Sequence, residues 1–379
     1  MEYLPQEISL DIFSRLPLGS LFHCRRVCSA WRSLVQHPSL LSLHSACHDS
    51  HTNPSLLFLS TKLYYFELVH IHDAGDELKL SENINIPFKS KINVPVKDVI
   101  SCNGLPFLYT GNVVPSASNF LSRFLPHRLL NPSNHHSRHE QIFIYNPLTG
   151  EFNILLDRLL PKHHYSVYGF GFHSITNEYK LVRIVNIDND QHIEVCTLGT
   201  NKWRIKKTRP YYMHRSTKVS VNGALHWVAK TQWPQKAGLH PIVSLDLLDE
   251  KIYRVPSPDC SLDFECYSEL MVLGGCLCIV NNVRIDCVRI WAMKDYGGKR
   301  KWVKEYAIVS TSPNIRGPFS PLCLLRNGRI LFQTGWGKLV CYDIVRKRCT
   351  HHQIKRINSG FQLVAHVGSL ISVMGAESY

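Results

Sequence analysis

The chain has 379 residues, of which 44% are hydrophobic and 19% charged, with a formal net charge of +14. This length exceeds the usual single domain, so either two domains or one large β architecture with an appendage is expected. The longest uncharged apolar run begins at Met271 and is about half as long as a bilayer crossing, so no transmembrane helix is expected.

The N-terminus and the cysteines predict an intracellular protein. Glu2, Glu7 and Asp11 precede the first basic residue, unlike in a secretory or mitochondrial leader. The 13 cysteines form no Cys-x-x-Cys pair, which favours reduced thiols. A cytoplasmic or nuclear protein that is not secreted fits best, and the basic runs at Lys299 and Arg346 are too short to argue for nuclear import.

The excess of basic residues lies beyond residue 48, since residues 1–48 carry four arginines against three acidic side chains. In residues 202–209, "KWRIKKTR", basic side chains alternate with Trp203 and Ile205. This alternation is typical of a half-buried strand with a basic face toward water. Binding of nucleic acid or of an acidic partner remains the alternative explanation of the charge.

Three short amphipathic helices are predicted in the first 40 residues. Ile8, Ile12 and Leu16 share one helical face after Pro5, and Pro17 ends that helix. Ser20 and Ser29 are expected to cap the second and third helices. So few residues cannot bury all of these apolar faces against one another, so the next domain or another protein must cover them.

The same residues resemble an F-box, the helical module by which substrate receptors dock onto the Skp-family adaptor of a cullin-RING ubiquitin ligase. The resemblance rests on two Leu-Pro pairs and the run "VCSAWR", spans roughly residues 2–45, and departs from the common pattern at Gly19 and Ser29. An ordinary helical subdomain packed on its own chain is the alternative. The resemblance implies that the following residues contact the adaptor: Leu4, Pro5, Ile8, Ile12, Leu16, Pro17, Leu21, Val27, Cys28, Trp31 and Leu34.

A repeat follows the helical segment. Glycines that stand before apolar runs recur, with spacings of roughly 40 to 55 residues from Gly169 onward, and each is followed by a second strand pair with its own turn. Four strands in such a repeat are typical of a β-propeller blade. In "NPLTGEFNIL", Asn146 to Gly150 is expected to be an ordinary outer-hairpin turn and Phe152 a packing residue. The markers are Gly104, Gly169, Gly223, Gly275, Gly328 and Gly368.

Six blades are predicted, with seven as the alternative. Five complete units span about 96–354. The strands expected after Ser55 and the strand pair expected in "FQLVAHVGSLISVMG" at the C-terminus are half-units that would share one blade, which leaves no free sheet edge. Residues 116–139 break the rhythm of the strands and are expected to form an inserted loop. The predicted domains are a helical module, residues 1–48, and a propeller, residues 50–379.

The repeat segments also resemble the F-box-associated domain of plant proteins, a kelch-like β-propeller. The fit rests on "GFGFHSITNEYKLVRIV", "NGALHW", "LDLLDEKIYRVPSP" and "GGCLCIV" with "IWAMKDYG", and it covers most of residues 50–375. It is weakest across 116–139. The resemblance implies a propeller that presents its loops to a protein target.

No catalytic residue, cofactor or metal site is predicted. His135, His136 and His139, with His163 and His164, could form a metal cluster, but the run 134–139 stands among Pro, Ser and Asn with no rigid element behind it. Cys276 and Cys278 share one face of a strand, which is more often a buried core position than a metal or redox site. "GFGF" lacks the other parts of a dinucleotide motif, and no nucleophile elbow occurs. Trp227, Trp233, Trp291 and Trp336 could stack on sugars but are better explained as blade core.

We therefore expect a non-enzymatic substrate receptor of an SCF-type ubiquitin ligase. The expected partners are a Skp-family adaptor, through it the cullin and RING subunits, and a protein target that the sequence does not identify. A non-degradative scaffold and a basic-surface binding protein remain alternatives. Fold alone does not specify the ligand, so the substrate-binding residues stay unassigned.

Overall fold

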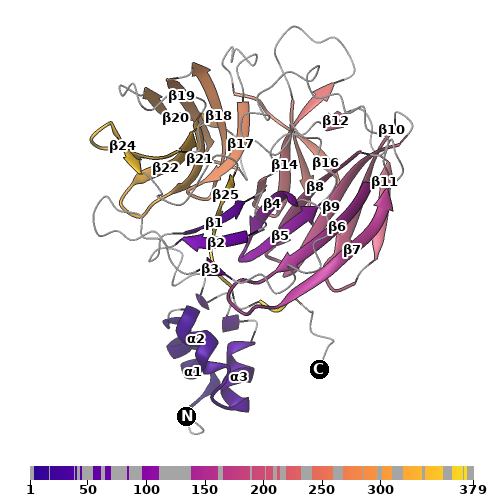
Figure 1. Ribbon diagram of the computed structural model, residues 1–379, viewed down its shortest axis with the longest axis vertical. Coiled ribbons are helices and arrows are strands. Elements are labelled where there is room, and N and C mark those ends of the chain that lie inside the picture. Colours follow the sequence, from indigo (N-terminus) through magenta and orange to yellow (C-terminus); the bar gives the residue numbers. More distant parts are fainter. Residues whose placement is uncertain are drawn as a thin grey trace.

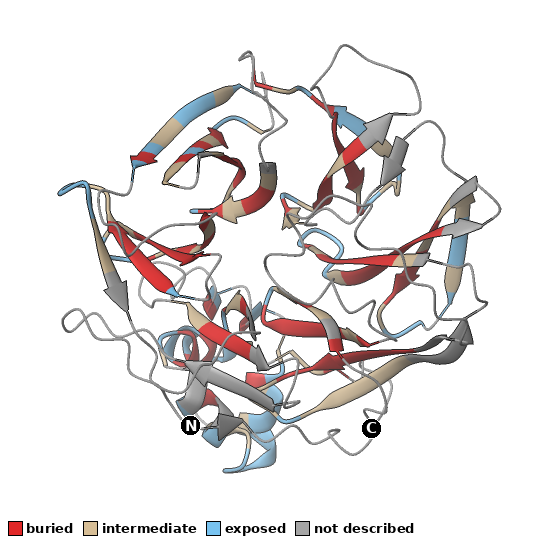
Figure 2. Ribbon diagram, turned by 45° about the horizontal axis from the view of Figure 1, so that its top comes forward, coloured by how far each residue is buried: buried red, intermediate tan, exposed pale blue. Residues whose placement is uncertain are grey.

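The computed structural model describes most of the chain as three short helices followed by strands arranged in a ring (Figure 2). The described residues are 4–16, 18–37, 39–40, 43–44, 54–60, 65–69, 83–84, 96–110, 138–160, 165–187, 190–200, 202–207, 211–213, 219–231, 241–258, 268–284, 286–296, 301–309, 319–334, 338–352, 361–369 and 371–373. Within them, no helix is long and apolar enough to span a membrane.

The helices are α1 (Gln6–Ser14), α2 (Leu18–Cys24) and α3 (Ser29–Val35). Both predicted serine caps are wrong. Ser20 lies inside α2, and Cys28 caps α3, where its Sγ accepts a hydrogen bond from the backbone N–H of Trp31. Cys28 has the extended backbone conformation that a cap requires, so the helix begins one residue earlier than predicted.

The helices are held together by one apolar cluster, because helices of seven to nine residues are not stable alone in water. Phe13 and Trp31 meet edge to face with ring centroids 5.2 Å apart, a preferred aromatic geometry. The buried members of the cluster are Leu10, Phe13, Leu21, Val35 and Leu40.

The described strands form six sheets. Five of them are blades that each use one continuous segment of chain. Blade 1 holds β4 (Val96–Cys102), β5 (Leu105–Thr110), β6 (Arg138–Tyr145) and β7 (Phe152–Leu160). Blade 2 holds β8 (Tyr165–His173), β9 (Glu178–Ile187), β10 (Asp190–Thr197) and β11 (Trp203–Lys207).

The next three blades follow in chain order. Blade 3 holds β12 (Tyr211–Met213), β13 (Val219–Val221), β14 (Ala224–Thr231), β15 (Ile242–Asp246) and β16 (Ile252–Val255). Both β12 and β13 pair with β14 and count together as the first strand of this blade. Blade 4 holds β17 (Ser268–Leu273), β18 (Cys276–Arg284), β19 (Cys287–Met293) and β20 (Trp302–Val309). Blade 5 holds β21 (Phe319–Leu324), β22 (Arg329–Thr334), β23 (Leu339–Asp343) and β24 (Arg348–His352).

The remaining sheet, which we call the mixed sheet, takes strands from both ends of the chain. Its order is β25 (Phe361–His366), β1 (Ser55–Ser60), β2 (Tyr65–Val69) and β3 (Asn83–Ile84). β25 pairs antiparallel with β1, from Ser55 opposite His366 to Ser60 opposite Phe361. The prediction that the two half-units share one sheet is therefore confirmed.

The inner strands connect the sheets into a closed series. β4 contacts β8, β8 contacts β13, β13 contacts β17, β17 contacts β21, β21 contacts β25, and β25 contacts β4. Between β4 and β25, Ser101 Oγ lies 2.9 Å from His366 Nδ1. The described strands form no seventh sheet, so the seven-blade alternative is not supported.

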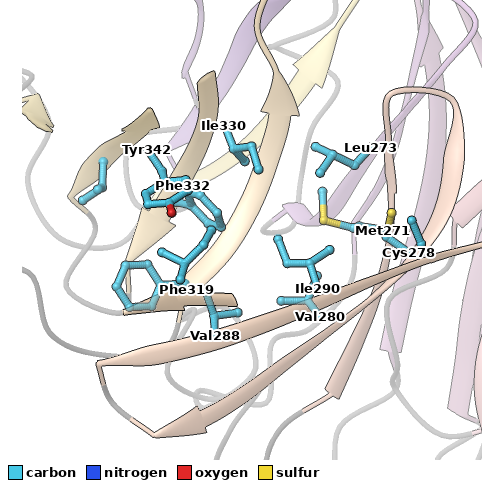
Figure 3. Close-up of a cluster of buried hydrophobic side chains, with 13 residues drawn as sticks. Met271, Leu273, Cys278, Val280, Val288, Ile290, Phe319, Ile330, Phe332 and Tyr342 are labelled. Carbon is cyan, nitrogen blue, oxygen red and sulfur yellow. The ribbon is translucent and has the colours of Figure 1, made fainter. Parts of the chain in front are cut away.

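Apolar side chains of neighbouring blades pack against one another. Figure 3 shows Met271, Val280 and Ile290 of blade 4 facing Phe319 and Phe332 of blade 5 in one buried cluster. Strands covered on both faces in this way alternate little between apolar and polar residues. This explains the long apolar runs that the sequence shows around Met271.

The marker glycines lie in first-to-second strand turns in four of six cases. Gly104, Gly223, Gly275 and Gly328 have positive φ values between +69° and +83°, a conformation that glycine adopts without strain. Gly169 instead lies inside β8. Gly368 follows β25, and the described residues after it form no strand, so the predicted second C-terminal strand is wrong over residues 367–369 and 371–373.

The third-to-fourth strand turns of blades 1, 3 and 5 are built alike. They start at Asn146, Asp246 and Asp343, whose side-chain oxygens accept hydrogen bonds from the backbone N–H groups two and three residues later. The fifth residue has positive φ in each: Gly150 at +74°, Glu250 at +56° and Lys347 at +53°. Such side-chain caps fix the turn.

The predicted inserted loop lies mostly outside the described residues. Its last two positions, Arg138 and His139, are not loop but the first residues of β6, where they pair with Leu160 and Leu159. Strand β6 therefore begins at Arg138, within the range that was predicted to be a loop.

Candidate functional site

The first helix carries an apolar stripe that the protein itself leaves uncovered. Leu4, Ile8 and Ile12 are 43%, 47% and 37% exposed. They are four residues apart, so Ile8 and Ile12 are neighbours on one face of α1 and Leu4 stands just before it. Val27, in the turn after α2, is 62% exposed. Large apolar side chains gathered on so small a module are typical of an interaction surface.

The other predicted adaptor contacts lie elsewhere. Pro5 and Cys28 are exposed, whereas Leu16, Trp31 and Leu34 are partly buried against the helical cluster. Leu21 is completely buried inside that cluster, so it stabilises the helices and offers no surface to a partner. Pro17 lies outside the described residues.

The helices are attached to blade 1 through the turn Asn146–Glu151. Leu148 packs against the helical cluster, and the Arg25 guanidinium lies 3.5 Å from Glu151 Oε1. Both charged side chains are largely buried, at 15% and 22% exposed. Figure 1 shows the helices below the ring. The attachment leaves Leu4, Ile8 and Ile12 uncovered.

The segment after β25 lies across the same turn. Asn146 Nδ2 donates hydrogen bonds to the carbonyl oxygens of Ser369 and Ile371, both at 2.8 Å. The backbone N–H of Val373 donates to Glu151 Oε2 at 3.2 Å. Val373 is 1% exposed and packs in the core cluster between blades 1 and 2. We call residues 367–369 and 371–373 the C-terminal strap.

The most concentrated charge cluster of the described propeller joins blades 2 and 3. The Glu250 carboxylate lies within 3.1 Å of Lys180 Nζ and of Lys206 Nζ, and it also accepts hydrogen bonds from Arg204. Burial alone would raise the pKa of Glu250, but hydrogen bonds from Arg204, Lys206 and Lys180 outweigh it and lower the pKa to about 2. The cluster stabilises the packing of the two blades.

Replacing Glu250 with glutamine is expected to destabilise the propeller by about 1 to 2 kcal/mol near pH 7. The folded-state pKa lies below the ordinary value of 4.5, so this stabilisation is complete above about pH 4.5 and is lost as the pH falls toward 2. Denaturant unfolding of both proteins between pH 7 and pH 2.5 measures the difference. A difference that stays constant over this range would contradict the assignment.

The basic strand β11 differs from its prediction in one respect. Ile205 is 68% exposed, although the alternating pattern predicted that it would be buried with Trp203. Arg204 and Lys206 instead lean on Glu250. Because this carboxylate belongs to the next blade, the basic face of the strand is partly engaged within the protein rather than wholly solvated.

The candidate metal and stacking residues show no ligand-binding arrangement in the part of the chain that is described. No group of three or more His, Cys, Asp or Glu side chains is placed to hold a metal there. Burial raises the pKa of Cys278 to about 12, so its thiol is protonated. Trp227 is a core residue, Trp291 packs against another core cluster, and Trp233, Trp336 and the histidines 135, 136, 163 and 164 lie outside the described residues.

Sequence reasoning missed the role of the turn Asn146–Glu151. It treated this turn as an ordinary hairpin, whereas Asn146, Leu148 and Glu151 contact the C-terminal strap and the helices. One signal was available: Asn146 stands where the equivalent turns have Asp246 and Asp343, and only an amide can donate hydrogen bonds as well as accept them.

Comparison with known proteins gives two family matches. Residues 1–42 match the family described as F-box-like, and residues 129–373 match the F-box associated beta propeller domain. F-box protein At3g07870 of Arabidopsis thaliana is 30% identical, over 98% of this chain and 92% of its own length. F-box protein CPR1 of the same plant is 26% identical, over 98% of this chain and 89% of its own length.

Solved structures resemble the chain only distantly. An oligogalacturonate lyase in complex with manganese matches with a TM-score of 0.42 and 11% identity, over 79% of this chain and 76% of its own. A likeness of this size carries no inference about activity.

Proposed function

Since the chain belongs to the F-box proteins that carry an F-box associated β-propeller, we propose that it is the non-catalytic substrate receptor of an SCF-type ubiquitin ligase. The F-box, residues 1–48, binds a Skp-family adaptor and through it the cullin and RING subunits. The propeller, residues 50–379, binds a protein target inside the cell. The chain supplies proximity and orientation, and other subunits transfer ubiquitin.

The uncovered apolar stripe on α1 is the observation that carries this proposal. Leu4, Ile8 and Ile12 are exposed although the helical cluster buries Leu10 and Phe13 of the same segment. Burying three such side chains against a partner contributes roughly 1.5 to 3 kcal/mol for each one fully buried. Pro5, Val27 and Cys28 extend the surface, and Leu16, Trp31 and Leu34 support it from within the cluster.

The target is proposed to bind the face of the ring opposite the F-box. Antiparallel strands place the first-to-second and third-to-fourth turns of each blade on one face, and the turn that contacts the helices is of the second kind. The remaining connections therefore start and end at the opposite face. They include residues 111–137, the longest connection between consecutive described strands, and residues 256–267. Binding residues are disproportionately found on long loops carried by a rigid scaffold.

The proposed ring has six blades, with the mixed sheet as the closing one. The closed series of contacts between inner strands supports this arrangement. Antiparallel pairing of β25 with β1 joins strands from the two ends of the described propeller in one sheet, and a ring of blades leaves only short, protected sheet edges.

Affinity purification under proteasome inhibition tests the proposal. The intact chain is expected to retain the adaptor, the cullin and a set of proteins that accumulate when the proteasome is blocked. A full-length Ile8→Asp variant, which alters only an exposed side chain, is expected to retain the accumulating proteins and lose the adaptor and cullin. Recovery of no adaptor with the intact chain would overturn the proposed function.

A further inference from the structure

The contacts of Glu151 link three parts of the chain that are far apart in sequence. One oxygen of its carboxylate faces Arg25 of the F-box at 3.5 Å. The other accepts the backbone N–H of Val373 from the C-terminal strap at 3.2 Å. Glu151 is the last residue of this turn of blade 1, and Leu148 of the same turn packs against the helical cluster. The side chains of Glu151 and Leu148 therefore both contact the F-box, and that of Glu151 also contacts the C-terminal strap.

We infer that the turn Asn146–Glu151 and the C-terminal strap form a clamp that fixes the F-box at one orientation on the propeller. This inference rests on the proposed function. In an assembled ligase, a fixed orientation would direct the bound target toward the site of ubiquitin transfer. Leu148, Asn146 and Glu151 are positioning residues in this scheme, because they contact the helices and the C-terminal strap.

The clamp is specific to blade 1. Leu148 is partly buried against the helices, whereas its counterparts Leu248 and Val345 in the equivalent turns are 56% and 87% exposed. All three turns use the same side-chain cap. The contact with the helices, and not the geometry of the turn, therefore distinguishes Leu148.

Asn146 is specific in a second way. Its Oδ1 caps the turn, as Asp246 and Asp343 do, while its Nδ2 donates to Ser369 and Ile371. An aspartate at this position would still cap the turn but could donate neither bond, and its charge would face two carbonyl oxygens. Asn146 is completely buried, so the lost bonds could not be replaced by water without opening the strap.

The strap also closes over the first turn of blade 1. A Cβ placed on Gly104 would lie 2.9 Å from the backbone nitrogen of Ser369. Tyr179 of blade 2 donates a hydrogen bond to the carbonyl oxygen of Asn103 at 2.7 Å in the same region. The strap is thus seated on two turns of blade 1, and its last described residue, Val373, is buried between blades 1 and 2.

Hydrogen exchange of the full-length chain tests the clamp without requiring any partner. Leu148→Ser and Glu151→Gln are each expected to speed hydrogen exchange of the amides in α1 to α3 by roughly 5-fold or more. Asn146→Asp is expected to speed the exchange of amides in both the strap and the helices by a similar factor. The matched controls Leu248→Ser, Lys251→Ala and Asp246→Asn change the equivalent turn of blade 3 and are expected to leave the helices unchanged. Unchanged exchange in the helices of both Leu148→Ser and Glu151→Gln would overturn the inference.

A second measurement separates positioning from adaptor binding. The purified chain is assembled with adaptor, cullin and RING subunits, and self-ubiquitination of the propeller is followed with the sites mapped by mass spectrometry. Leu148→Ser is expected to leave the adaptor Kd within about twofold of the intact chain, because Leu148 lies outside the exposed stripe of Leu4, Ile8 and Ile12 that is proposed to bind the adaptor. It is also expected to spread ubiquitin over more lysines. An unchanged site pattern would contradict the clamp, whereas failure of the intact chain to bind the adaptor would contradict only the proposed function.

Discussion

Replacing both Ile8 and Ile12 with aspartate is expected to weaken binding of the Skp-family adaptor by at least about 100-fold. Each change removes an exposed apolar side chain from the stripe on α1 and places a charge that the complex would have to bury. Loss of one central contact typically costs about 2 kcal/mol or more, and 1.4 kcal/mol corresponds to tenfold in Kd. Isothermal calorimetry with the purified adaptor measures the change.

The control for this experiment is Val345→Asp, which alters a side chain that is 87% exposed on blade 5. It is expected to bind the adaptor like the intact chain. Circular dichroism should report the same helix and strand content for all three proteins, since neither isoleucine belongs to the buried cluster. Binding by the double variant within a factor of three of the intact chain would rule out the stripe as the docking surface.

Changing Gly104 to alanine is expected to destabilise the protein by about 2 to 4 kcal/mol. The residue has a φ of +83°, which costs an alanine about 1 to 2 kcal/mol. The added Cβ also meets the backbone of Ser369, so the strap must move away from Asn146. Apparent Tm at a fixed scan rate, together with denaturant unfolding, measures the loss.

Gly275→Ala is the matched control for this substitution. Gly275 occupies the corresponding turn of blade 4 with a φ of +73°, and a Cβ there would meet nothing within 4 Å. It is expected to show only the backbone strain. Equal destabilisation by the two alanine substitutions would mean that the strap does not restrict the space around Gly104.

The order of elements was predictable because it depends on local patterns. Paired prolines and apolar spacing predicted the helices, and glycines followed by apolar runs predicted the hairpins, four of which the structure places at turns with positive φ. The sharing of one sheet by the two ends also followed from counting, since each end supplied strands without partners. A side-chain period of two or four residues is enough for such predictions.

Contacts between distant segments were not predictable in the same way. Nothing in the pattern of residues 361–373 distinguishes a strand pair from a strand followed by a strap. The outcome depends on Asn146, because its side-chain amide donates hydrogen bonds to two carbonyl groups that would otherwise accept bonds from a partner strand. Likewise, Trp203 and Ile205 have the alternating spacing of two buried residues. Which face of β11 is covered depends instead on Glu250 of the next blade, because its carboxylate pairs with Arg204 on the other face.

The residues predicted to contact the adaptor differ in how far the structure exposes them. The list of eleven adaptor contacts mixed exposed residues such as Ile8 with a core residue, Leu21. Spacing assigns residues to one helical face, but only the packing of three helices decides which face becomes the interior. Substituting Trp31 would therefore disturb folding as well as docking, because its ring contacts Phe13.

The pairing of β1 with β25 has a consequence for how the protein is made. Its two strands stand near opposite ends of the chain, so the mixed sheet cannot form until nearly all of the chain has left the ribosome. Contacts of such long sequence separation form slowly. The F-box helices emerge first and hold their own apolar cluster, so their docking surface is complete before the ring that would carry a target. During synthesis, binding of the proposed adaptor therefore does not have to wait for the ring that is proposed to bind a target.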